Sequence, residues 1–227
     1  MTATLIQSPD RVILRNIRWQ TYQFLIRDFE SEPAIRLTYD RGTLEIRMPL
    51  NPHETYKKLL GRLIETATEE LDLEIRSLGS RTCGSCGVAL CAKREDLARG
   101  LEPDQCYYIQ NEARVRDIEQ IDLAHFPPPD LAVEVDISSS SLDRLSIYTD
   151  LGVPELWRYD GRSLTLYQLQ NGQYLPCNRS IALPLLQASD ITRFLELRFP
   201  QDKTQASLGE NSLVKQFRHW LRSQKVN

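Results

Sequence analysis

Residues 127–157 read PPPDLAVEVDISSSSLDRLSIYTDLGVPELW and contain three signals of local structure. The segment LAVEVDI is rich in branched apolar residues at alternate positions, which predicts a strand. The segment SLDRLSIYTDL has apolar residues near helical spacing, and Gly152 and Pro154 follow it, which predicts a helix that ends there. PELWRYD predicts a second strand after this helix.

The first of these strands carries three carboxylates on one face. Alternation places Asp130, Ala132, Glu134 and Asp136 on that face. Such acids repel one another and cost free energy if they are buried without partners. A divalent cation would remove both costs, and hard oxygen donors suit Mg²⁺, Mn²⁺ or Ca²⁺ rather than zinc. The alternative is an edge strand with a solvated acidic face; against it, the small Ala132 leaves room beside Glu134 for a ligand.

The rest of the chain supplies further strands and helices on both sides of this stretch. Helices are expected over residues 16–31 and 51–71, and the second is the strongest, with Glu54 in its first turn. Strand patterns cover residues 34–40, 43–49, 73–78, 106–110, 154–160, 163–170 and 171–177. The ranges 34–49 and 154–170 predict hairpins around glycine-containing turns. Residues 112–126 predict a short helix or a surface excursion.

This order of elements predicts an α/β (α+β) fold in one domain. We expect residues 1–188 to form the main body and residues 189–227 a helical C-terminal appendage of the same domain. Within the appendage, Leu213, Phe217 and Leu221 form an apolar stripe.

Composition limits the classes of function. The chain has 227 residues, 41% of them hydrophobic and 26% charged, which is usual for a soluble globular protein. No stretch approaches the roughly 20 apolar residues of a membrane span, and MTATLIQSPDRV lacks the features of a signal peptide, so we expect a cytoplasmic protein. The net charge of −3 means that a nucleic-acid role must rest on a local basic face or on bound metal cations.

The cysteines suggest a competing interpretation. Cys83, Cys86 and Cys91 lie in CGSCGVALC, in which the first two have the C-x-x-C spacing of zinc and dithiol redox sites. No second C-x-x-C or H-x-x-x-H pair completes a four-ligand zinc site. A glycine-rich loop with incidental thiols is therefore favoured.

The chain also lacks G-x-x-x-x-G-K-S/T, G-x-G-x-x-G and G-x-S-x-G motifs, which argues against common nucleotide-binding and acyl-transfer sites.

Several motifs together carry a family resemblance. EPD at 102–104, PDLAVEV at 129–135, Tyr148 and GVPELW at 152–157 resemble the restriction-endonuclease-like family sometimes called Uma-two, within the PD-(D/E)XK nuclease superfamily. The resemblance runs from about Trp19 to Tyr159. It implies a restriction-endonuclease-like mixed β-sheet flanked by α-helices, with the active site where two strands diverge.

The resemblance also implies roles for individual residues. Asp104 and Glu134 correspond to the aspartate and glutamate that hold Mg²⁺ (or Mn²⁺), and Glu54 to a helix glutamate that completes or orients the site. The superfamily's lysine is replaced: Asp136 stands at the E-x-K position, and Arg144 lies four residues before Tyr148, where relatives place a lysine. Arginine can bind a phosphate but is a poor proton acceptor. Asp130 is interpreted as a residue at the start of the strand rather than a ligand.

We therefore expect a metal-dependent endonuclease acting on DNA, with Asp104, Glu134, Arg144 and Glu54 as catalytic residues. RNA as the substrate and a homodimer that pairs two active sites both stay open. The rival hypothesis is a catalytically weak or inactive module of the same fold that binds nucleic acid or protein. It is favoured by the missing lysine and by a sequence pI of about 5.7.

Overall fold

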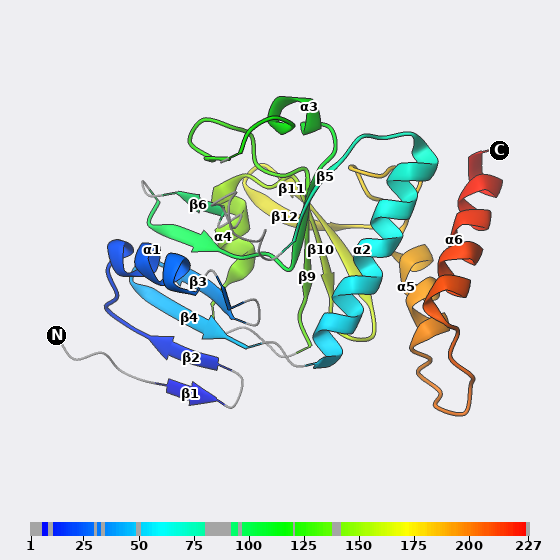
Figure 1. The fold of residues 1–227 in the computed structure, drawn as a ribbon, viewed down its shortest axis with the longest axis horizontal. Coiled ribbons are helices and arrows are strands. Elements are labelled where there is room, and N and C mark those ends of the chain that lie inside the picture. The colour runs from blue at the N-terminus through cyan, green and yellow to red at the C-terminus, as the bar shows by residue number, and fades with distance from the viewer. Residues whose placement is uncertain are drawn as a thin grey trace.

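The computed structural model describes residues 6–8, 11–29, 31–32, 35–48, 51–79, 92–94, 97–119, 121–137 and 142–225. Within them the chain forms two six-stranded sheets and six α-helices. Figure 1 shows the two sheets beside each other, with α1 at one end of the molecule and α6 at the other.

The stretch 127–157 forms the centre of a mixed sheet. This sheet has the order β12 (Gln173–Cys177), β11 (Leu164–Gln170), β10 (Glu155–Tyr159), β9 (Leu131–Val135), β8 (Gln105–Tyr108) and β5 (Arg76–Gly79). β9 and β10 are parallel, and the other neighbours are antiparallel. Parallel strands need a crossover, which α4 (Arg144–Leu151) supplies. Gly152 ends α4 at a φ of 73°, as the sequence predicts, because this left-handed conformation favours glycine.

A second sheet is antiparallel throughout. Its order is β1 (Ile6–Ser8), β2 (Arg11–Leu14), β4 (Thr43–Arg47), β3 (Arg36–Asp40), β7 (Arg99–Leu101) and β6 (Ala92–Arg94). One face carries Leu37, Tyr39 and Leu44, which pack against Trp19 and Tyr22 of α1 (Trp19–Asp28). Because side chains alternate along a strand, the other face carries buried polar residues. These are Arg36, Thr38, Glu45 and Arg47.

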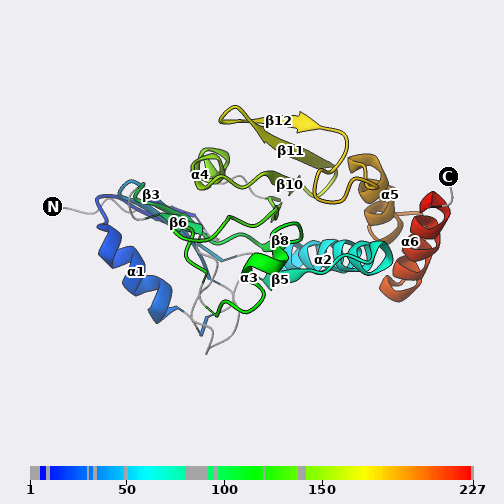
Figure 2. The same cartoon turned by 90° about the horizontal axis from the view of Figure 1, so that it is seen from above.

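Helices cover both faces of the mixed sheet. The core on one face joins α2 (Asn51–Leu71), α5 (Ala188–Arg198) and α6 (Glu210–Lys225) to β9, β10 and β11. On the other face, α4 packs over Ala132, Cys106 and Leu156, and α3 (Glu112–Val115) contributes Val115. Figure 2 shows α2 running from the middle of the molecule, along one face of the mixed sheet, toward α5 and α6. The first turn of α2 therefore lies where the two sheets approach each other.

The predicted fold class is confirmed, and the order of most elements agrees with it. The predicted helices, hairpins and strand at 171–177 are present, and Leu213, Phe217 and Leu221 are buried on α6 as expected. The region 112–126 contains only the short α3. The sequence analysis expected one mixed sheet. The structure has a second sheet as well, which includes the short strands β1, β2, β6 and β7. Ser138–Ser141 lie outside the described residues.

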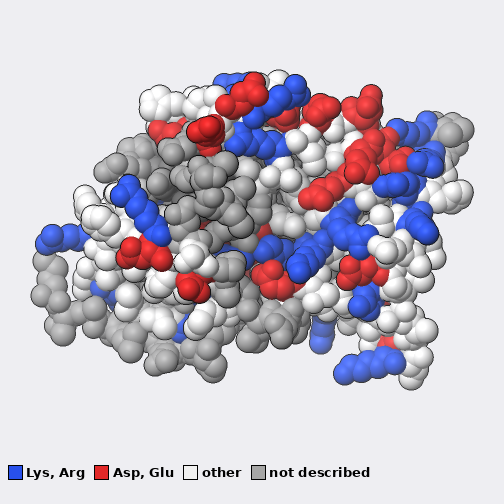
Figure 3. Space-filling view, viewed as in Figure 1, with Lys and Arg blue, Asp and Glu red and all other residues white. Residues whose placement is uncertain are grey.

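The surface carries mixed charge. In Figure 3, basic side chains gather over α2 and α6 with acidic side chains between them. Four ion pairs link these helices: Arg62–Glu210, Arg218–Glu69, Arg218–Glu70 and Arg222–Glu70. This face is therefore not a uniform positive surface. Within the described chain, no helix combines the length and apolarity needed to cross a membrane.

Candidate active site

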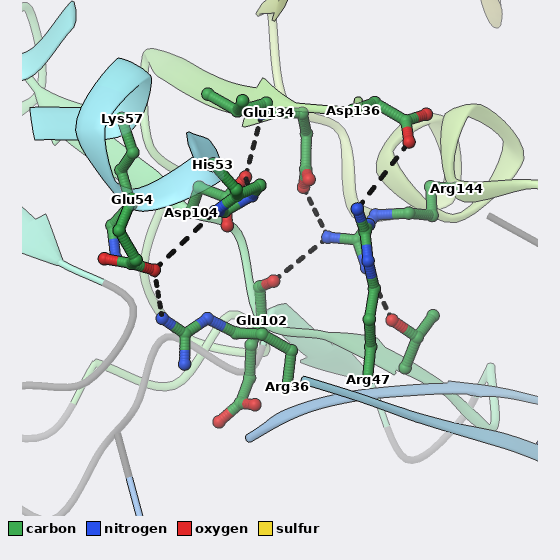
Figure 4. A network of polar contacts seen from close by, with 12 residues as sticks. Arg36, Arg47, His53, Glu54, Lys57, Glu102, Asp104, Glu134, Asp136 and Arg144 are labelled. Carbon is green, nitrogen blue, oxygen red and sulfur yellow. Dashed lines mark hydrogen bonds and ion pairs between the residues drawn. The ribbon is translucent and has the colours of Figure 1, made fainter. Parts of the chain in front are cut away.

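Asp104 and Glu134 meet because β8 and β9 are neighbours. The antiparallel register pairs Gln105 with Val133 and Cys106 with Ala132. Continued by one residue, it brings Asp104 opposite Glu134, and directly opposite residues point to the same face of a sheet. Both side chains are buried, with 5% and 7% of their surface exposed. The two carboxylates from separate P-D and V-E-V motifs thus form one cluster (Figure 4).

Glu134 is held by two residues of α4. Arg144 and Tyr148 both donate hydrogen bonds to Oε1 of Glu134. Arg144 also donates to the carbonyl of Glu102 (3.0 Å) and to Oγ1 of Thr38 (2.5 Å) on β3. The Arg144 guanidinium therefore connects α4 to both sheets, and it lies beside Glu134 rather than in open solvent.

Asp104 is held from the first turn of α2. Its Oδ2 accepts a hydrogen bond from the backbone N–H of Val135 (2.8 Å) and lies 2.9 Å from Nε2 of His53. His53 is itself 3% exposed. The sequence analysis did not single out this histidine. Its position directly before Glu54, in the first turn of a strong helix, is the one available signal.

Glu54 lies on the outer side of the cluster among cations. Its carboxylate is 3.2 Å from Nζ of Lys57 and 3.6 Å from both Nδ1 of His53 and Nη2 of Arg36. With 38% of its side chain exposed, Glu54 is the most open carboxylate of the site. His53 lies between Glu54 and Asp104. Glu54 is therefore linked to the two buried acids through His53.

The polar face of the antiparallel sheet forms one wall. Arg36 and Arg47 project from it toward the cluster (Figure 4), and Thr38 on the same face contacts Arg144. Arg47 lies 3.8 Å from Oδ1 of Asp136, whose Oδ2 accepts a hydrogen bond from Arg158 (2.5 Å). Asp136, which stands at the lysine position of E-x-K, is therefore paired with two arginines.

The electrostatics of the site follow from burial and these neighbours. Burial lowers the pKa of His53, but the hydrogen bond and charge of Asp104, together with the nearby Glu54 carboxylate, raise it to about 9. The interaction with His53, supported by Lys57 and Arg36, lowers the pKa of Glu54 to about 2. Burial raises the pKa of Asp104, but His53 and the N–H of Val135 outweigh it and lower the pKa. Burial raises the pKa of Glu134, and the charge of Asp104 adds to this against the effect of Arg144.

The His53 contacts predict a pH dependence of stability. A histidine whose pKa rises from 6.5 to about 9 on folding stabilises the native state fully below pH 6.5, and the contribution is lost as the pH rises through 9. We expect the difference in unfolding free energy between the wild type and His53→Gln to shrink over this range in urea titrations. His125→Gln, at a histidine 76% exposed, is the control. A pH-independent difference would contradict the ion pair.

Two expectations about β9 are corrected. The edge-strand alternative is wrong, because β9 lies inside the sheet between β10 and β8 and every residue from Leu131 to Val135 is buried. Ala132 does not leave space for a ligand, since it packs in the core beneath Ile147 and Tyr148 of α4. The polar neighbourhood of Glu134 comes instead from Asp104, Arg144 and Tyr148.

Asp130 has a structural position, in line with its interpretation as a residue at the start of the strand. Its Oδ2 accepts hydrogen bonds from the backbone N–H groups of Ile109 (2.7 Å) and Asn111 (2.9 Å). Its Oδ1 accepts from Nδ2 of Asn111 (2.6 Å). These contacts fix the turn that follows β8. The two P-D aspartates therefore differ in their partners, and Asp104 alone lies opposite Glu134.

The predicted metal ligands fit a divalent cation through their free oxygens. In the described chain, hydrogen bonds reach only Oδ2 of Asp104 and only Oε1 of Glu134. Each carboxylate keeps one oxygen for a ligand, and Mg²⁺ commonly uses one or two protein carboxylates, with water and substrate phosphates completing its shell. No group of three or more His, Cys, Asp or Glu side chains suited to a metal occurs among the described residues. Cys83, Cys86 and Cys91 lie outside them.

Two comparisons with known proteins found a match. The model of the Uma2 family, described as "Putative restriction endonuclease", matches residues 19–199. The chain is also similar to a solved structure described as a putative nuclease belonging to DUF820 from Anabaena variabilis. The identity is 14%, the match covers 80% of this chain and 90% of that chain, and the TM-score is 0.41. No curated protein sequence matches the chain.

Proposed function

Because the chain belongs to the Uma2 family of restriction-endonuclease-like proteins, we propose that it is a metal-dependent endonuclease that hydrolyses phosphodiester bonds in DNA. The observation that carries this proposal is the pair of buried carboxylates, Asp104 and Glu134, on neighbouring strands. Each has one oxygen that no described residue engages. Their mutual repulsion, which contributes to the raised pKa of Glu134, is the cost that a bound cation would remove.

Asp104 and Glu134 would hold Mg²⁺ or Mn²⁺. When bound, such an ion polarises a phosphoryl oxygen and lowers the pKa of a coordinated water. The protein's own contribution is to fix its donors before the substrate arrives. His53 and the N–H of Val135 orient Asp104, while Arg144 and Tyr148 orient Glu134. Such fixed partners around ligand carboxylates typically support metal affinity.

The cations around the carboxylates would receive the phosphate. Arg144 was expected to bind it, but its terminal nitrogens donate to Glu134, Glu102 and Thr38. Contact between Arg144 and a phosphate would require one of these bonds to be exchanged. Lys57 and Arg36 lie next to Glu54, with side chains only 11% and 5% exposed. We propose that these two cations add to the positive potential that a phosphate would meet at the site and that Glu54 keeps them in place.

Plasmid nicking tests the proposed function. Supercoiled DNA should be converted to the open circular form by the full-length protein with Mg²⁺ or Mn²⁺, and EDTA should stop the reaction. The double variant Asp104→Ala Glu134→Ala, prepared in parallel, controls for contaminating nucleases. Equal nicking by wild type and double variant, or none by the wild type with either ion, would refute the proposal.

A second candidate function is a binding module of the same fold without efficient chemistry. The observation in its favour is that protein cations already neutralise both carboxylates: His53 pairs with Asp104 and Arg144 with Glu134. Calorimetry separates the two candidates. Metal binding at the carboxylates with no cleavage of DNA or RNA would favour the module, and an Arg144→Lys variant that gains cleavage would locate the defect at that residue.

A further inference from the structure

An open groove lies between α5 and α6, at the far end of α2 from the carboxylates. It encloses about 560 Å³, within the usual range for ligand sites. Its surface is mainly apolar and includes Phe194, Leu197 and Trp220. Phe194 is buried, Trp220 is half-buried, and Leu197 is exposed, so the groove presents an aliphatic and aromatic floor to solvent.

The aromatic floor is held rigidly. Trp220 stacks on Phe217 of the core, with ring centroids 5.7 Å apart and planes inclined by 23°. It also contacts Phe194, with centroids 5.6 Å apart. The Arg193 guanidinium lies 4.9 Å from the centre of the Phe194 ring and 5.6 Å from that of Trp220. This cation–π contact holds Arg193 at the groove, beside the rings on which a base could stack after the guanidinium moves.

The two charged residues that line the groove are both basic. They are Arg193 and Lys215, and both are exposed, as is the neighbouring His219. Within the described chain, neither Arg193 nor Lys215 forms an ion pair with an acidic side chain. The arginines between α2 and α6 differ, because Arg62, Arg218 and Arg222 are each paired with a glutamate. The groove therefore has positive charge that no neighbouring acid neutralises.

We propose that this groove binds a segment of single-stranded nucleic acid. A base would replace the Arg193 guanidinium on the half-buried Trp220, and the displaced Arg193 and Lys215 would contact adjacent phosphates. Aromatic platforms beside basic side chains bind single strands in this way, and the arginine fork matches phosphate oxygens. This inference rests on the proposed function, because it assigns the groove to a strand of the same substrate class, held away from the site of cleavage.

Other occupants fit the charge less well. Two copies of the chain joined symmetrically through this groove would bring Arg193 and Lys215 of both copies together, which is unfavourable. An acidic peptide would satisfy the rim, but it would leave the flat aromatic surface without a matching ring unless the peptide supplied one. A nucleotide provides both the ring and the charge.

Tryptophan fluorescence can test the groove directly. Of the three tryptophans, Trp19 and Trp157 are buried at 8% and 0% exposure, so Trp220 is the one that a ligand can reach. Titration of the full-length protein with an oligothymidylate in EDTA should quench its fluorescence to saturation. EDTA prevents cleavage, so binding is measured whether or not the protein is a nuclease.

The substitutions isolate the two parts of the interaction. Arg193→Ala Lys215→Ala should weaken binding at least ten-fold and reduce the slope of log K against log salt by about 1.4, for two lost phosphate contacts. Arg162→Ala Lys203→Ala removes the same charge from exposed positions outside the groove and should change little. An oligomer of equal length without bases should bind about ten-fold more weakly, because the stacking is lost.

Three results would overturn the inference. The first is the absence of quenching, or quenching that the groove variant does not reduce relative to the control variant. The second is equal quenching by polyglutamate, which would indicate an acidic protein partner. The third is a Trp220 signal that depends on protein concentration without any ligand, together with a doubled mass, which would indicate a second copy. If plasmid nicking fails while oligothymidylate still binds through the groove residues, the proposed cleavage is wrong and the groove stands.

Discussion

Replacement of Arg144 by methionine is expected to lower the free energy of unfolding by about 3–5 kcal/mol, the usual effect of removing one partner from a buried ion pair. The side chains of Arg144 and Glu134 are 12% and 7% exposed. Without the guanidinium, Glu134 would remain buried beside Asp104, and the two negative charges would repel each other. The Arg144 bonds to Glu102 and Thr38 would also be lost.

A double-mutant cycle identifies the source of this loss. Arg144→Met Glu134→Gln removes both charges, so we expect it to recover much of the stability that Arg144→Met loses. Arg162→Met, at an exposed turn, should stay within about 0.5 kcal/mol of the wild type. Urea unfolding with circular dichroism measures these four proteins and Glu134→Gln, the second single variant that the cycle requires. If Arg144→Met lies within 1 kcal/mol of the wild type, Arg144 is not the principal counter-ion of Glu134.

The same variant connects stability to metal binding. A divalent cation between Asp104 and Glu134 would replace the lost positive charge, so Mg²⁺ should stabilise Arg144→Met more than it stabilises the wild type. A ligand that binds only the native state raises its stability by RT ln(1 + L/Kd), where L is the free ligand concentration, so tighter binding gives a larger increase. An equal shift of the melting temperature in both proteins would argue against a shared site for the ion and the guanidinium.

Replacement of Asp104 by asparagine is expected to lower the rate of metal-dependent plasmid nicking at least a hundred-fold. The substitution keeps the size of the side chain but removes the charge that would hold the cation. The bonds from His53 and Val135 both reach Oδ2, and an amide oxygen can still accept them. The effect should therefore appear mainly in activity rather than in folding.

Asp130→Asn is the matched control for Asp104→Asn. Both aspartates follow a proline and both are buried, at 5% and 4% exposure. Asp130, however, accepts three hydrogen bonds from the turn after β8. Its replacement should reduce stability while the nicking rate per folded molecule stays within a few-fold of the wild type. Equal losses of activity in both variants would mean that the two P-D motifs cannot be assigned these separate roles.

The sequence predicted the central unit well because its signals are local. In residues 127–157 the alternation, the helical spacing and Gly152 each act within a few positions, and they specify β9, α4 and β10. The strong helix α2 and the two hairpins are local in the same sense. Element type and order could therefore be predicted without knowledge of the tertiary contacts.

The second sheet could not be predicted in this way. Its strands β1, β6 and β7 have three residues each, too few for an alternating pattern. β1 and β6 pair with the strands that follow them in sequence, and β7 joins the sheet by pairing with the distant β3. The buried polar face lies on β3 and β4, whose hairpin was predicted, but the side to which it turns depends on tertiary packing that no local pattern shows.

The site was predicted in part. Asp104 and Glu134 were selected by motif, and the register of β8 and β9 does place them opposite each other. His53 was missed, because its partner Asp104 lies 51 residues away and a single histidine carries no pattern. Arg144 was selected for a phosphate, whereas packing of α4 against both sheets directs it to Glu134. The catalytic roles of Asp104, Glu134, Arg144 and Glu54 remain predictions.

The location of a bound Mn²⁺ tests the central claim most directly. Crystals of the full-length protein soaked in Mn²⁺ should give an anomalous difference peak in contact with Oδ1 of Asp104 and Oε2 of Glu134, the two oxygens that no described residue engages. Soaked crystals of Asp104→Asn should lack that peak. A fully occupied Mn²⁺ elsewhere, with Asp104 still on His53 and Glu134 still on Arg144, would contradict the assignment of these carboxylates as the metal site of a nuclease.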